Sequence, residues 1–158
     1  MDDHVGHIAQ AWPELRVLKL SDCCLCGSLR SIAAGLRHLD VLEIARTEWY
    51  SDVEFHDMCI NLAATLRHLN VTDCASFTIT CAHMVATTLI NLQWLEARNT
   101  PLTDADLLQF ARMNRSLRYL NIAPTRTEYA EYEYLPFTND TIQQFKNLLP
   151  ACNIIHEV

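Results

Sequence analysis

Glycine and proline are scarce in this chain, with only three glycines and five prolines among 158 residues. Linkers between domains are commonly rich in glycine, serine or proline, and no such stretch interrupts this sequence. The length suits one domain with a continuous core, since 50% of the residues are hydrophobic. We therefore expect a single domain over residues 1–158.

Long apolar runs and a basic start are also missing. Every apolar stretch falls far short of the roughly 20 residues that a helix needs to cross a bilayer. The first residues, Met1 to His4, lack the positive charge of a signal peptide. We predict no direct membrane insertion and a reducing, intracellular compartment, the cytoplasm or the nucleus, with the mitochondrion as the alternative. The seven cysteines would remain thiols there.

Positive charge is in deficit. The 12 lysines and arginines are scattered along the chain and stand against 19 acidic residues, which gives a formal net charge of −7. Contacts with a nucleic-acid backbone need clustered lysine and arginine side chains. We therefore expect a protein partner and no nucleic-acid partner.

The feature that is present is an internal repeat. Leu15–Cys23 reads L-x-x-L-x-L-x-x-C, and Leu66–Cys74 repeats this pattern. Three further copies carry threonine in the ninth place, and they span residues 39–47, 92–100 and 117–125. A degenerate sixth copy ends the chain at Leu149, Cys152 and Ile154. The first leucines of the first five copies follow one another at 24 to 27 residues, within the range of about 20–29 that is typical of leucine-rich repeats.

Each copy predicts a short parallel strand whose fourth and sixth residues are buried, with the small Cys or Thr side chain at the strand exit. Ser51–Glu54 and Thr103–Asp106 resemble capping boxes, and each opens an amphipathic helix. In the first of these helices we expect Val53, Met58 and Leu62 to face the sheet, and in the second Leu107, Leu108 and Ala111.

Helices are also expected near residues 28–36, 79–89 and 139–149, the last with Ile142, Phe145 and Leu149 on its apolar face. Residues 1–14 are predicted to form an N-terminal helix or cap with an apolar stripe of Val5, Ile8, Ala9 and Trp12. The predicted fold class is therefore α/β, a right-handed leucine-rich-repeat solenoid. About six short parallel strands would line its concave face and helices its convex face.

The repeat starts, such as Trp12–Leu20, resemble the cysteine-containing leucine-rich repeats of F-box proteins over nearly the whole chain. The resemblance covers the repeat region only, and no F-box is recognised in the sequence. In that family the repeats select the substrate of a cullin-based ubiquitin ligase. The resemblance therefore implies a non-enzymatic protein–protein interaction module that recognises a ligase substrate. The alternative is an accessory subunit or assembly factor of a large multiprotein complex, including a mitochondrial one.

The third, fifth and seventh residues of each strand motif are expected to face outward. The third place brings His68, Trp94 and Tyr119 onto adjacent strands, and such an aromatic ladder is a candidate centre for partner binding because Trp, Tyr and Arg dominate interface energetics. The fifth and seventh places add the neighbouring candidates Asn70, Glu96, Arg98 and Asn121. The alternative is that the ladder packs only on itself or lies beneath an inserted loop.

That insertion spans residues 126–137 and is acidic and rich in tyrosine, with Tyr129, Tyr132 and Tyr134 among three glutamates. Long loops in compact domains are often functional. We predict either a contact loop for a basic partner surface or a solvated loop that lies over the last repeat.

Recognisable catalytic chemistry is absent. Cys23-Cys24-x-Cys26 suggests a metal site, but the paired C-x₂-C or H-x₃₋₅-H elements of structural zinc sites are missing. The three glycines lie too far apart for a phosphate loop, and no G-x-S-x-G or H-E-x-x-H occurs. We predict buried, inert thiols, no metal, no cofactor and no enzymatic activity. A Cys–His pair that folding brings together remains the alternative.

Overall fold

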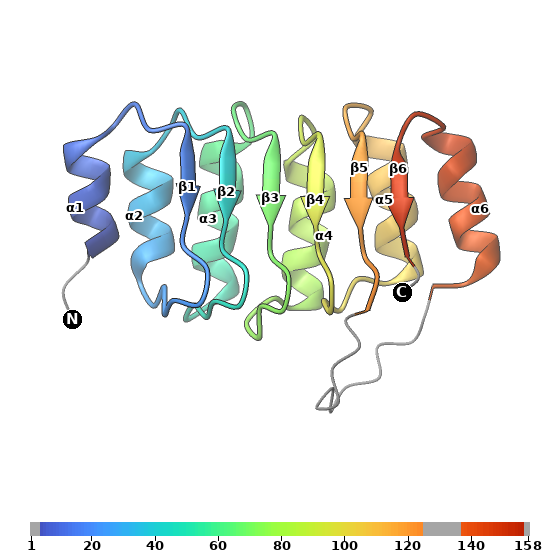
Figure 1. Ribbon diagram of the computed structural model, residues 1–158, viewed down its shortest axis with the longest axis horizontal. Coiled ribbons are helices and arrows are strands. Elements are labelled where there is room, and N and C mark those ends of the chain that lie inside the picture. The colour runs from blue at the N-terminus through green and yellow to red at the C-terminus, as the bar shows by residue number, and fades with distance from the viewer. Residues whose placement is uncertain (1–3, 125–136, 157–158) are drawn as a thin grey trace.

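A computed structural model describes residues 4–124 and 137–156, in which helices and three-residue strands alternate (Figure 1). The strands are β1 Val17–Lys19, β2 Val41–Glu43, β3 His68–Asn70, β4 Trp94–Glu96, β5 Tyr119–Asn121 and β6 Asn153–Ile155. The helices are α1 His4–Ala11, α2 Ser28–Gly35, α3 Asp52–Leu62, α4 Ile79–Thr88, α5 Asp104–Met113 and α6 Asn139–Leu148. No helix in these ranges is long and apolar enough to span a membrane.

Every strand pairs in parallel with its sequence neighbour, and the sheet order runs from β1 to β6. The helices cover one side of this sheet, as Figure 1 shows with the strands in front. The middle residues of the first five strands, Leu18, Leu42, Leu69, Leu95 and Leu120, are all buried beneath the helices. The first and third residues of each strand point to the opposite side of the sheet, away from the helices. We call this side of the sheet, which faces away from the helices, the strand face. The predicted α/β solenoid with six parallel strands is confirmed.

One apolar core runs the length of the solenoid, because each helix packs on the helix of the next repeat. Phe55 in α3, Phe110 in α5 and Phe145 in α6 are the largest fully buried side chains of this core. Burying one such side chain stabilises a fold by roughly 1.5–3 kcal/mol. The predicted helix faces are confirmed at Met58, Leu62, Leu107, Ala111, Ile142, Phe145 and Leu149.

Two of the apolar side chains predicted to be buried are exposed, and two others, Ile8 and Leu108, are only half-buried. Val53 is 60% exposed, since the buried face of α3 consists of Phe55, Met58, Cys59 and Leu62, and Val53 lies two residues before this set on the other side of the helix. Trp12 is 61% exposed because α1 ends at Ala11, before the stripe reaches it.

The two predicted capping boxes behave differently. At α5 both bonds form, because the Thr103 hydroxyl accepts from the Asp106 N–H and the Asp106 carboxylate accepts from the Thr103 N–H. At α3 the Ser51 side chain makes no cap, since the Glu54 N–H donates to the Ser51 carbonyl at 3.2 Å. The prediction for Ser51–Glu54 is therefore wrong.

The last strand pairs out of the predicted register. Asn153 lies opposite Tyr119, where the motif placed Ala151, and Cys152 precedes β6. The Cys152 N–H donates to the Leu149 carbonyl as the Leu92 N–H does to that of Leu89. Cys152 thus takes the place of a first leucine, and β6 begins directly after it. The sixth copy is one residue shorter at this point, which shifts the register.

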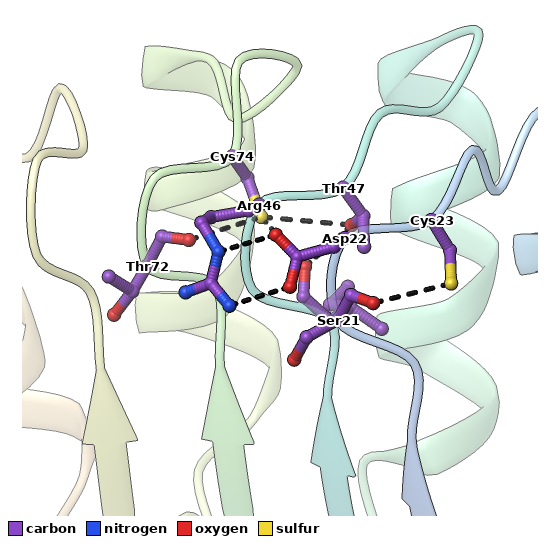
Figure 2. Close-up of polar contacts among 8 residues, drawn as sticks. Ser21, Asp22, Cys23, Arg46, Thr47, Thr72 and Cys74 are labelled. Carbon is purple, nitrogen blue, oxygen red and sulfur yellow. Dashed lines mark hydrogen bonds and ion pairs between the residues drawn. The ribbon is translucent and has the colours of Figure 1, made fainter.

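The turns that leave the first four strands share one backbone geometry. Their eighth residues are left-handed, with φ of 60° at Asp22, 54° at Arg46, 57° at Asp73 and 51° at Asn99. Asparagine and aspartate tolerate this conformation best among residues with a side chain. Their side chains join neighbouring repeats. Arg46 donates to the Asp22 carboxylate (Figure 2), and Asn99 donates to the Asp73 carboxylate.

The ninth residues are buried in the inner repeats and exposed in the first one. Thr47 and Thr100 each donate to the carbonyl three residues earlier, and the Cys74 thiol donates to the Ile44 carbonyl at 2.9 Å. Cys23 is exposed, so the prediction of a buried thiol is wrong there. No strand lies on the outer side of β1 in the described part of the chain.

Candidate functional site

The strand face carries the predicted ladder. Strand pairing places His68 beside Trp94 and Trp94 beside Tyr119. The ring centroids of Trp94 and Tyr119 lie 3.7 Å apart at an interplanar angle of 13°, and those of His68 and Trp94 lie 5.5 Å apart at 19°. Three rings from three repeats therefore form one continuous stack, and Trp94 at its centre is 38% exposed.

Both titratable rings of this stack favour their neutral forms. Burial lowers the pKa of His68, although Glu43 and Glu96 oppose the shift. Burial also raises the pKa of Tyr119, and the negative charge of Glu96 adds to the effect. The stack therefore presents aromatic surface without a net charge at neutral pH.

The fifth places put polar groups next to the rings. The Trp94 indole N–H donates to the Glu96 carboxylate at 3.3 Å. The side-chain oxygens of Asn70 and Asn121 each accept the backbone N–H two residues later, that of Thr72 or Ala123. These two asparagines thus hold the turns, a role that the repeat pattern did not predict. A short polar residue two places before a turn was the available signal.

Two polar atoms beside the stack lack a hydrogen-bond partner within the described residues. They are the Thr72 hydroxyl and the Nε of Arg98, both buried. Thr72 and Arg98 occupy the seventh places of adjacent strands, because Asn70 pairs with Glu96 two residues before them. Figure 2 shows the Thr72 hydroxyl turned away from the Asp22–Arg46 pair. A buried polar atom without a partner costs roughly 1–3 kcal/mol.

A solved leucine-rich-repeat protein has this fold. It comes from Leptospira interrogans, and the alignment covers 98% of this chain with a TM-score of 0.54 and 18% sequence identity. The chain spans about a third of that protein, since the alignment covers 33% of its length. At this identity the likeness establishes the fold alone. No family model matches the sequence, and no curated protein matches it either.

The other predicted contact residues, Tyr129, Tyr132 and Tyr134, lie outside the described residues, as does all of the insertion except Phe137. Within the described ranges no three His, Cys, Asp or Glu side chains gather where they could hold a metal ion. The cysteines divide into two groups. Cys59, Cys74, Cys81 and Cys152 are buried, whereas Cys23 and Cys24 are exposed and Cys26 is half-buried. The prediction of inert thiols therefore applies to the buried group, where burial raises each pKa.

Proposed function

We propose that this protein is a non-enzymatic protein–protein interaction module that holds its partner on the strand face. The observation that carries the proposal is the half-exposed stack of His68, Trp94 and Tyr119. Aromatic side chains and arginine supply most of the binding energy in protein interfaces.

The leucine-rich-repeat resemblance supports a finer version of the proposal. In F-box proteins such repeats select substrates for a cullin-based ubiquitin ligase, and this chain would do the same in an intracellular, reducing compartment. The exposed edge of β1 supports the second candidate, a subunit of a larger complex, because an unpaired strand edge is favourable for a neighbour to cover.

Replacement of Trp94 by alanine tests the proposal. Tagged wild-type protein is expressed in native cells, its bound proteins are quantified, and the affinity of the main partner is then measured by calorimetry. We expect Trp94→Ala to weaken binding by about 2 kcal/mol, roughly thirtyfold in Kd. Trp12→Ala is the matched control, since Trp12 is an exposed tryptophan outside the sheet.

An unchanged Kd for a folded Trp94→Ala protein would refute the role of the strand face. Circular dichroism of each variant establishes that the fold is retained. The identity of the bound proteins distinguishes the two candidate roles. Recovery of a cullin scaffold would support substrate selection for a ubiquitin ligase. Recovery of a particle of fixed composition would support a subunit of a larger complex.

A further inference from the structure

A pair of thiols lies in the turn between β1 and α2. Leu25 is 2% exposed and anchors this turn in the core, and its N–H donates to the Glu48 carbonyl at 2.8 Å. Cys24 and Cys26 flank this anchor, so both side chains are displaced toward the surface. Their sulfur atoms lie 2.8 Å apart.

This separation discriminates between two uses of a thiol pair. Two thiolates on a tetrahedral zinc ion lie about 3.8 Å apart, given Zn–S bonds of about 2.3 Å. The sulfur atoms of a disulfide lie about 2.05 Å apart. The observed distance of 2.8 Å is closer to the disulfide value than to the zinc value.

We propose that Cys24 and Cys26 form a redox-active dithiol that exchanges with a low-molecular-weight disulfide such as glutathione disulfide. In the first step, a thiolate on Cys24 attacks one sulfur of that disulfide, its S–S bond breaks, and one glutathione thiolate leaves. In the second step, Cys26 loses its proton and attacks the Cys24 sulfur, and the second glutathione thiolate leaves. The two protein thiols are oxidised to one disulfide, and the two glutathione thiolates take up the two protons.

The order of attack follows from exposure. Cys24 is exposed and Cys26 is half-buried, so Cys24 meets the incoming disulfide first. The hydrogen bond with Cys24 raises the pKa of Cys26, which therefore keeps its proton until the mixed disulfide has formed. A disulfide in so short a loop is strained, and strained, exposed disulfides are the easily reduced ones. The reaction would thus be reversible.

Cys23 provides the matched control. Like Cys24, it is exposed, and it precedes Cys24 directly in the chain, but its thiol donates to the Ser21 carbonyl at 3.3 Å (Figure 2). We expect Cys23 to form a mixed disulfide with glutathione without an internal partner to resolve it.

Mass spectrometry of the folded, full-length protein tests the proposal after equilibration in buffers of reduced and oxidised glutathione. Trypsin releases the three cysteines together in peptide 20–30. In Cys23→Ser we expect this peptide to lose two hydrogens and to carry no glutathione. In the wild type we expect the same loss of two hydrogens together with one glutathione adduct, which fragmentation assigns to Cys23. In Cys26→Ser it would instead keep a glutathione adduct on Cys24, and reductant would restore all thiols.

Two outcomes would overturn the proposal. One is a wild-type protein that keeps as much glutathione adduct on Cys24 as Cys26→Ser does. The other is a disulfide that disappears in Cys23→Ser, which would assign the pairing to Cys23. The fully buried Cys59 should stay unmodified throughout and reports that the protein remained folded.

Discussion

The same motif position has opposite surroundings at Cys74 and at Cys23. The Cys74 sulfur is buried because the Ile44 carbonyl and the Thr47 hydroxyl of the preceding repeat cover it. Cys23 follows β1, which pairs only with β2 in the described part of the chain, and it is exposed. Burial at the ninth place is therefore a property of two adjacent repeats and does not come from the motif alone.

The largest expected effect comes from replacing a buried leucine by alanine in an inner strand and in the outermost strand. Leu69 in β3 has a strand on either side and is 0% exposed, whereas Leu18 in β1 is 6% exposed. We expect Leu69→Ala to lower the free energy of unfolding by about 3–4 kcal/mol and Leu18→Ala by about 2 kcal/mol. Urea denaturation measures both. Equal losses would mean that the outer repeat is as well supported as the inner one.

Truncation of the ninth-place cysteines should have a smaller effect. Cys74→Ala removes a buried sulfur and its hydrogen bond to the Ile44 carbonyl, and we expect a loss of about 1 kcal/mol. Cys23→Ala changes an exposed side chain and should stay within about 0.5 kcal/mol of the wild type. Both are measured under reducing conditions, and a larger loss for Cys23→Ala would contradict the comparison.

The smallest effect concerns the ion pair that joins the first two turns. Arg46 Nε lies 2.6 Å from the Asp22 carboxylate, and both side chains are more than half exposed. The hydrogen bond from Arg46 lowers the pKa of Asp22. The pair therefore stabilises the fold above the unfolded pKa of about 4, and this contribution is lost as the pH falls through the folded pKa.

Arg46→Gln tests this dependence through the melting temperature. The small gap in Tm between wild type and variant should be present at neutral pH and close on acidification. A gap that persists at a pH where Asp22 is protonated would point to packing of the arginine stem instead.

The repeat made most of the fold predictable. Each copy has apolar residues at its fourth and sixth places, and the first five copies follow one another at 24 to 27 residues, which leaves few alternative folds. His68, Trp94 and Tyr119 were placed together by spacing alone, and the strand pairing brings them together as predicted. Their role in binding remains a prediction.

Three local features could not be predicted from the repeat: the cap of α3, the register of β6 and the contact between two thiols. Ser51 matches a capping sequence as well as Thr103 does, but its own carbonyl takes the bond at α3. The register of β6 depends on a single residue that is missing next to Cys152. Both Leu149 and Cys152 are apolar and could stand for the first leucine of the motif, so the sequence does not reveal which of them does. The contact between Cys24 and Cys26 depends on Leu25 turning inward, which a repeat pattern does not specify.

Helices and strands make their main contacts with the next repeat along the chain. Loops between contacting residues are therefore short, and the entropy lost in closing them is small and similar from repeat to repeat. Folding in such a chain can start at any adjacent pair of repeats and spread in both directions. A protein bound at β3 to β5 would slow amide hydrogen exchange most in the middle of the molecule. Its influence on α1 would have to pass through each intervening interface in turn.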